Sequence, residues 1–259
     1  IEIVVRDDKL NPAEAALMAL DLTGNGVNLL VGGQLSAPAL AVIGLLNESK
    51  AVFQAEGASL MSITHEGFHT NAFRAGASIR TSYYAFAKGV ASKAPPVARW
   101  GSIIVDAEFG YSNLKTISNG LRKFSNGRAM EFAPPQLSKF GAPDYRVQIS
   151  QLMSENIDGL YIGLVGADFA SFMNQAAPFG LLKKVKAVMD GTAGMFTYAK
   201  TQKKNIPNNV WTLSPWDPEL DTHPESKALF EEYVKMSGDR SPDPQTGTAH
   251  DMVFAYANA

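Results

Sequence analysis

Cysteine is absent from this sequence of 259 residues. Its absence excludes disulfides, thiolate nucleophiles and cysteine-ligated metal sites, and it suits an oxidising compartment. The first residue is Ile1 rather than an initiator Met. We therefore expect a mature or truncated chain from which a secretory signal peptide has been removed.

Strong charge of one sign and long apolar runs are also lacking. The formal net charge is -2, and no run of like charges is longer than two residues. Such a chain offers no electrostatic footprint for nucleic acid or for an anionic lipid surface. The longest apolar stretch lies around residues 40–46, and it is far shorter than the roughly 20 residues that cross a bilayer. We therefore exclude nucleic acid as a partner and expect no membrane-spanning segment.

Hydrophobic residues make up 46% of the chain, which is ample material for one or two packed domains. Short β-branched runs alternate with longer stretches of helical periodicity. The predicted strands cover residues 1–6, 28–31, 51–54, 72–74, 102–105, 130–132, 159–162 and 185–189, and the principal predicted helices cover 13–22, 38–47, 113–124, 145–156, 169–179 and 226–236. This alternation predicts an α/β fold with doubly wound parallel sheets covered by helices on both faces.

Two loops that carry glycine and serine follow neighbouring predicted strands. One is Gly32-Gly33-Gln34-Leu35-Ser36, which leads into a helix, and the other is Gly57-Ala58-Ser59. Backbone N–H groups at a helix N-terminus favour an anion, and the carboxyl ends of adjacent parallel strands meet at one edge of a sheet. Neither loop matches G-x-G-x-x-G or a Walker A motif, so neither predicts a nucleotide phosphate. We predict a carboxylate site here; capping of the helix by Ser36 is a compatible role.

The segment His65-Glu66-Gly67-Phe68-His69 matches the H-E-x-x-H pattern. On a helix, the two histidines would lie on one side and could hold zinc while the glutamate activates water. Gly67 inside the motif costs about 1 kcal/mol in a helix relative to Ala, and the residues on both sides favour turns. No Gly-x-Ser-x-Gly motif occurs either. We expect a protein that is not an enzyme, with zinc hydrolysis as a less favoured alternative.

Seven short stretches of the chain match one known family in order and at similar intervals. They are residues 1–8 (IEIVVRDD) with Asn11-Pro12, 31–36 (VGGQLS), 57–59 (GAS) with Thr64, Phe73-Arg74, 105–110 (VDAEFG), 158–163 (DGLYIG) and 214–217 (SPWD). With these matches the chain resembles the branched-chain amino-acid-type periplasmic binding proteins of ABC transporters, which have the type 1 periplasmic binding fold. The resemblance covers essentially the whole chain.

The resemblance implies two doubly wound α/β lobes, joined by hinge strands, that close on a small molecule. Lobe 1 would comprise residues 1–78 and 214–259, incomplete at both ends relative to the family, and lobe 2 would comprise residues 79–213. The protein would be the extracytoplasmic solute-binding component of an ABC transporter and would deliver its solute to a membrane permease. We expect a monomer without cofactor or metal, located in the periplasm or anchored by lipid outside a Gram-positive cell.

The resemblance also assigns ligand-binding positions in lobe 1. Ser36 and Ser59 match family positions whose hydroxyls and neighbouring amides hold the ligand carboxylate. Leu35 stands beside the first serine, and Gly57 and Ala58 precede the second. We predict that these five residues form the carboxylate-binding part of the site.

In lobe 2, Phe109 falls where the family often places an aromatic residue against the ligand side chain, with core packing as its alternative role. Val165 stands where an aromatic residue is common. Amino-acid binders carry an acid that meets the ligand ammonium; here the best-matched position is Thr192, and Asp190 could substitute for it. We interpret Arg74 as a structural residue at a strand end.

Val165 and Thr192 differ from the residue types that amino-acid binders carry at these positions. This difference leaves the ligand class open between two kinds of carboxylate. One is a branched-chain or other hydrophobic amino acid, and the second is a related aromatic or aliphatic acid without an amine. A buried ammonium without a compensating charge costs several kcal/mol, so the second class competes if neither candidate acid reaches the site. The alternative function is a ligand-sensing domain of a receptor or regulator with the same fold.

Overall fold

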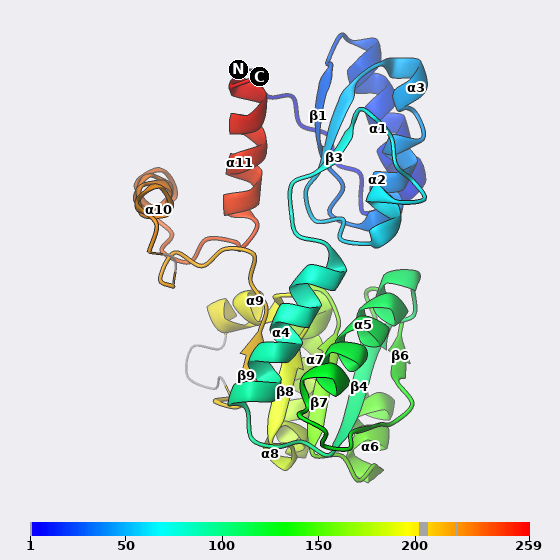
Figure 1. The fold of residues 1–259 in the computed structure, drawn as a ribbon, viewed down its shortest axis with the longest axis vertical. Helices are drawn as coiled ribbons and strands as arrows, with labels where there is room; N and C mark the ends of the chain where they lie inside the picture. The colour runs from blue at the N-terminus through cyan, green and yellow to red at the C-terminus, as the bar shows by residue number, and fades with distance from the viewer. Residues whose placement is uncertain (1, 202–206, 221) are drawn as a thin grey trace. The chain divides into compact units, whose positions relative to one another are not determined.

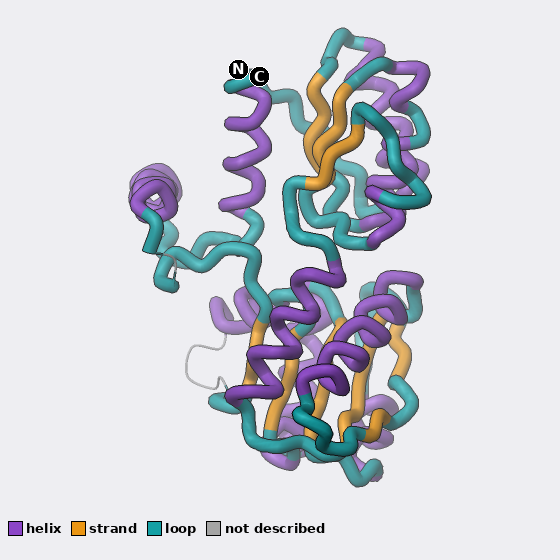
Figure 2. Tube along the Cα trace, in the orientation of Figure 1, coloured by secondary structure: helices purple, strands orange, loops and turns teal. Residues whose placement is uncertain are grey.

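The computed structural model describes residues 2–201, 207–220 and 222–259 (Figures 1 and 2). The chain divides into two compact units: unit 1 comprises Ile1–Ile79 and Pro215–Ala259, and unit 2 comprises Arg80–Ser214. Each unit has a parallel β-sheet of its own, so the predicted α/β class with parallel sheets is confirmed. Within the described ranges, no helix has both the length and the apolar character that crossing a membrane requires.

Unit 1 is built on a three-stranded parallel sheet in the order β1-β2-β3. Its elements are β1 (Leu29–Gly32), β2 (Val52–Ala55), β3 (Ala72–Arg74), α1 (Pro12–Gly24), α2 (Ser36–Ile43), α3 (Leu46–Ser49), the 3-10 helix η1 (Met61–Thr64), α10 (Pro224–Ser237) and α11 (Thr246–Ala257). Leu30 and Phe53 of the sheet pack with Ala15 and Ala39 of the helices in one buried cluster. Figure 1 shows α1, α2 and α3 gathered on this face of the sheet.

The start of α1 follows from local sequence chemistry. The Asn11 side chain accepts hydrogen bonds from the N–H groups of Ala13 and Glu14, and Pro12 occupies the first helical turn. Asparagine satisfies N–H groups that have no intrahelical partner, and proline has the φ angle that a helix requires there. Ala15 and Ala19, four residues apart, then face the core.

The opposite face of the unit 1 sheet is contacted by α11. The Tyr256 hydroxyl donates to the carbonyl of Leu30 at 2.9 Å, and Gln54 Nε2 donates to the carbonyl of Met252 at 3.2 Å. Val31 and Phe73 lie level with Gln54 in the sheet register, and their side chains remain 44% and 54% exposed. The described part of α11 therefore covers only part of this face.

Unit 2 has a six-stranded parallel sheet in the order β5-β4-β7-β8-β9, with β6 also paired to β4. Its elements are α4 (Ile79–Lys93, whose first residue belongs to unit 1), β4 (Arg99–Val105), α5 (Glu108–Phe124), β5 (Glu131–Phe132), β6 (Gln136–Ser138), α6 (Arg146–Ser154), β7 (Gly159–Gly163), α7 (Gly166–Phe179), α8 (Leu181–Lys184), β8 (Ala187–Asp190), α9 (Gly194–Thr201) and β9 (Val210–Thr212).

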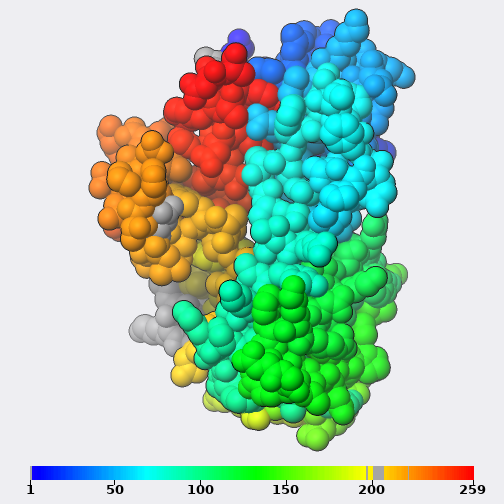
Figure 3. Space-filling view, in the orientation of Figure 1, coloured from blue at the N-terminus to red at the C-terminus, as the bar shows by residue number. Residues whose placement is uncertain are grey.

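Helices cover both faces of the unit 2 sheet. Figure 1 shows α4 and α5 across the near face, and the teal and green atoms of this part of the chain form the near surface in Figure 3. Leu160 and Val188 of the sheet pack with Ile149 and Phe172 of α6 and α7 on the other face. Every residue of β7 and β8 is buried. This is the arrangement that parallel strands require, because both of their faces are apolar.

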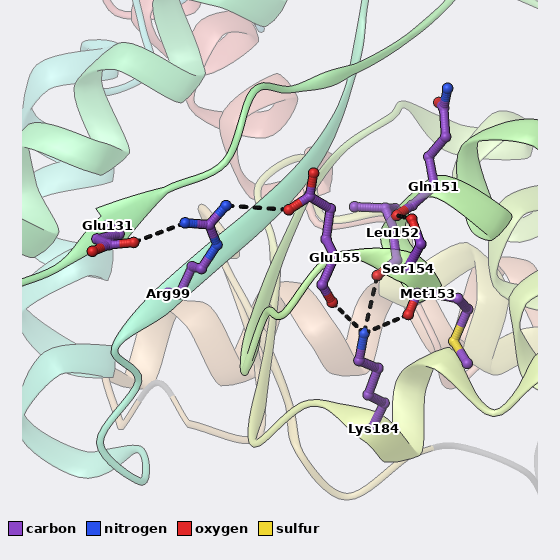
Figure 4. A network of polar contacts seen from close by, with 8 residues as sticks. All are labelled: Arg99, Glu131, Gln151, Leu152, Met153, Ser154, Glu155 and Lys184. Carbon is purple, nitrogen blue, oxygen red and sulfur yellow. Dashed lines mark hydrogen bonds and ion pairs between the residues drawn. The ribbon is translucent and has the colours of Figure 1, made fainter.

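The amino-terminal edge of this sheet carries a network of charges (Figure 4). Arg99 at the start of β4 donates to Glu131 at 2.7 Å and to Glu155 at 3.1 Å. Lys184 donates to the backbone carbonyls of Met153 at 2.8 Å and Glu155 at 2.5 Å, at the end of α6. Arg99 and its two partners are partly exposed, so we expect each ion pair to contribute no more than about 1 kcal/mol.

One predicted strand is wrong. Residues 2–6 form no strand, and the side chains of Ile3, Val4 and Val5 are 69%, 44% and 78% exposed; residue 1 lies outside the described residues. A β-branched run becomes a strand only when another strand pairs with it, and none of the described strands does so here. The predictions also omitted β6, β9, α9 and α11, which the structure contains.

Candidate functional site

The two loops predicted to bind a carboxylate lie together at the carboxyl edge of the unit 1 sheet. A Cβ atom on Gly57 would stand 2.7 Å from the carbonyl oxygen of Gln34, so only glycine permits this approach. The Ser36 hydroxyl accepts the N–H of Leu60 at 3.3 Å. Since β1 and β2 are parallel neighbours, both loops leave the same edge of the sheet.

The N-terminus of α2 is not capped by a side chain. Leu35 is the N-cap residue and makes no side-chain cap bond, and Ser36 is the first residue of the helix. The N–H groups of Ser36 and Ala37 therefore belong to the first turn, where a helix has no partner for them. Ser36 is buried, with 7% of its surface exposed, and its hydroxyl still has a proton to donate after it has accepted a hydrogen bond.

The second loop is fixed by its backbone. Ala58 is buried in the unit 1 core, and the carbonyl of Ser59 accepts the N–H of Ile79 at 2.8 Å. At the end of β3, Arg74 Nη1 donates to the carbonyl of Leu60 at 3.1 Å. The loop that contains Ser59 is thus held by α2 and by β3, with the serine half-buried between them.

Glu56, which opens the same loop, points to the other face of the sheet. It follows Ala55, whose side chain belongs to the core beneath α2, and side chains alternate along a strand. Burial, together with the nearby negative charge of Asp243, raises the pKa of Glu56 to about 7. This carboxyl group is therefore on the side of the sheet away from Ser36.

In unit 2, Asp190 ends β8 and is fully buried. Its carboxylate accepts the N–H groups of Thr192 at 3.0 Å, Gly194 at 3.2 Å and Met195 at 2.7 Å, and the Thr212 hydroxyl at 2.8 Å. Burial raises its pKa, and these hydrogen bonds oppose the rise. Asp190 therefore fixes the turn that begins α9, a role that sequence reasoning missed together with the helix itself.

The other predicted unit 2 residues lie beyond the carboxyl ends of the strands, at the same sheet edge as Asp190: Thr192 and Val165 in loops and Phe109 in the first turn of α5. The Thr192 hydroxyl donates to the carbonyl of Leu164, in the loop after β7. Val165 is the half-buried N-cap residue of α7. The ring of Phe109 packs against the ring of Phe140, with 5.7 Å between the ring centroids. The nine predicted ligand-binding residues thus form two groups, five at the carboxyl edge of the unit 1 sheet and four at that of unit 2.

The H-E-x-x-H segment does not lie on a helix. It follows η1 in a series of turns. His65 Nδ1 is 3.0 Å from the carbonyl of Met61, and His69 Nε2 is 2.8 Å from Asn47 Oδ1, so the two rings have separate partners. The zinc alternative requires both rings on one helical face, and the structure does not provide this arrangement.

Comparisons with known proteins give the family. The model of the family described as periplasmic binding protein matches residues 1–259. The chain belongs to this family, as predicted from its motifs. A search of curated proteins finds no match.

Solved structures of similar fold include several components of ABC transporters. The branched-chain amino acid transporter substrate-binding protein LivJ from Streptococcus pneumoniae, in complex with isoleucine, superposes with a TM-score of 0.82 at 18% identity, covering 100% of this chain and 71% of that chain. A solute-binding protein from Rhodopseudomonas palustris BisB5, in complex with 3,4-dihydroxybenzoic acid, superposes with a TM-score of 0.79 at 18% identity. The match covers 98% of this chain and 68% of that chain.

A third similar structure is an amino acid ABC transporter substrate-binding protein from Pseudomonas fluorescens Pf-5. It gives a TM-score of 0.79 at 17% identity and covers 92% of this chain, which spans 62% of that protein's length. Likeness at this level of identity shows the shared fold. The function therefore has to be argued from the residues of the chain itself.

Proposed function

We propose that the protein is the extracytoplasmic solute-binding component of an ABC transporter, which captures a small carboxylate and delivers it to a membrane permease. Membership of the periplasmic binding protein family supports this proposal. We further propose that units 1 and 2 are the two lobes that the family resemblance implies, and that the protein acts in the periplasm, or outside the cell on a lipid anchor. The transporter components among the similar structures favour this function over a ligand-sensing domain.

The observation that carries the proposal is the meeting of the two loops at the carboxyl edge of the unit 1 sheet. The first-turn N–H groups of α2 supply donors and the positive end of a helix dipole, both of which favour an anion. The Ser36 and Ser59 hydroxyls add donors from adjacent loops. Hydrogen bonds to a charged group contribute roughly 1.5–3 kcal/mol each, which is sufficient for two serines to discriminate a carboxylate from its neutral amide.

The hydrogen bonds that Asp190 already accepts favour a carboxylate ligand without an ammonium group. Meeting an ammonium would require its carboxylate to exchange hydrogen bonds that already come from three backbone N–H groups and Thr212. Thr192 has no charge and already bonds Leu164. We therefore propose aromatic or aliphatic acids as the first ligands to test and hydrophobic amino acids as the second.

Calorimetric titration of the protein with matched pairs tests the proposed function. The pairs are benzoate with benzamide, 3,4-dihydroxybenzoate with its amide, and isoleucine with isoleucinamide. We expect saturable binding of at least one acid and at least tenfold weaker binding of its amide. Absence of binding by every acid, or equal binding of acid and amide, would contradict the proposal.

A further inference from the structure

Arg74 ends β3 at the carboxyl edge of the unit 1 sheet, level with the ends of β1 and β2. The sheet register aligns Gly32 of β1, Ala55 of β2 and Arg74 of β3, so the three strands end at one level. Residues that pair across parallel strands project from the same face of the sheet. The Arg74 side chain therefore shares the face of Ala55, on which α2 lies.

One residue connects this arginine to the predicted carboxylate site. Leu60 donates its N–H to the Ser36 hydroxyl at 3.3 Å and accepts Arg74 Nη1 on its carbonyl at 3.1 Å. Leu60 directly follows Ser59. The guanidinium group therefore lies beside the loop on which both serines converge. It carries five N–H donors, and only one of them has a protein acceptor among the described residues.

The positive charge of Arg74 has no acidic partner in the described ranges of the chain. Glu56, at the neighbouring strand end, projects from the opposite face and is influenced by Asp243 instead. Partial burial lowers the pKa of Arg74, which is the mark of a cation that has lost solvation. A half-buried cation without a counter-charge is costly, and an anion at the adjacent loop would remove that cost.

We propose that Arg74 supplies the positive charge that binds the solute carboxylate held by Ser36 and Ser59. This inference rests on the proposed function and makes the arginine a binding residue rather than only the end of a strand. The hydrogen bond to Leu60 keeps the loop in place, while the remaining N–H groups of the guanidinium face the bound anion. The solute class is then one that carries a full negative charge at this end.

Three substitutions separate charge from loop positioning. Arg74→Gln removes the charge but keeps a donor for the Leu60 carbonyl, Arg74→Lys keeps the charge, and Arg74→Met removes both. Lys50→Met is the matched control, because it removes one exposed positive charge next to the amino end of β2, at the opposite edge of the same sheet. Titrations use benzoate with benzamide and isoleucine with isoleucinamide, each at low and high salt.

We expect Arg74→Gln to weaken acid binding about tenfold or more, which corresponds to about 1.4 kcal/mol or more. Amide binding should change less than threefold, and the salt dependence of acid binding should shrink. Arg74→Lys should retain most of the acid affinity, and Lys50→Met should retain all of it. Equal losses for acid and amide in Arg74→Gln, or no loss for either, would overturn the inference alone. Failure of the wild-type protein to bind benzoate, isoleucine and 3,4-dihydroxybenzoate alike would overturn the proposed function as well.

Discussion

Units 1 and 2 share the same alternation of strand and helix, but the residues of their strands are buried to different extents. In unit 2, all residues of β7 and β8 are buried between helices. In unit 1, Leu29 and Val31 of β1 are 50% and 44% exposed, and Phe73 of β3 is 54% exposed. The comparison shows that an apolar residue in a strand is not necessarily buried. How much of its surface is covered depends on how many helices and strands pack against that part of the sheet.

The largest expected effect contrasts one phenylalanine from each unit. Phe172→Ala in α7 removes a fully buried ring that packs edge-on against Tyr145 at 5.8 Å. It should lower the free energy of unfolding by about 3–5 kcal/mol. Phe73→Ala should change it by no more than about 0.5 kcal/mol, because the ring is already largely exposed. Urea unfolding followed by circular dichroism measures both, and a similar loss for the two variants would show that the Phe73 face is covered in solution.

The next effect concerns the aspartate that ends β8. Asp190→Asn places an amide nitrogen among N–H donors and leaves at least one of them without an acceptor. We expect a loss of about 2 kcal/mol in unfolding free energy, with the relative affinities for benzoate and isoleucine unchanged. A selective loss of isoleucine binding in calorimetric titrations, with benzoate unaffected, would show that Asp190 does meet an ammonium group.

Glu56 gives a smaller effect that depends on pH. Its folded-state pKa of about 7 lies above the ordinary value of 4.5, so the folded protein binds more protons between these values. Stability should therefore fall as pH rises from about 4.5 to 7 and remain lower above that range. Glu56→Gln should raise stability at pH 8 by about 1 kcal/mol, allowing for solvent screening of this partly exposed group, and should do little at pH 4.

Thermal melts across pH 4 to 8 follow this change, with Glu48→Gln as the control at an exposed acid of α3 in the same unit. A stabilisation by Glu56→Gln that is equal at both ends of the pH range would contradict a titrating carboxyl at this position. So would an equal response of the two variants.

Much of the architecture could be predicted because strand and helix periodicities differ. The strand at 72–74 has the predicted bounds, and the rule that adjacent parallel strands end at one edge correctly brought the loops of Ser36 and Gly57 together. The run at residues 2–6 has the same β-branched composition as true strands, so its failure to pair could not be read from composition.

The role of Asp190 was beyond prediction for a different reason. Its partners come from a turn a few residues ahead and from Thr212 on the neighbouring strand, and no sequence pattern indicates that long-range contact. Arg74 likewise has the sequence signature of a strand end. Its place beside the predicted carboxylate site is shown only by the hydrogen bond to the Leu60 carbonyl and by the projection of Glu56 from the opposite face of the sheet.

The most direct test of the central claim is calorimetric titration of Ser36→Ala and Ser59→Ala with the acid that the wild-type protein binds and with its amide. Ser49→Ala serves as the control, because Ser49 lies at the end of α3 just before β2, at the opposite edge of the sheet. Each site variant should lose about tenfold or more in acid affinity, from roughly 1.5–3 kcal/mol per charged hydrogen bond, with amide binding nearly unchanged. Ser36→Ala should also melt at a lower temperature, because it leaves the buried N–H of Leu60 without its acceptor, whereas Ser59→Ala should melt almost as the wild-type protein does. Wild-type acid affinity in both site variants would contradict the account.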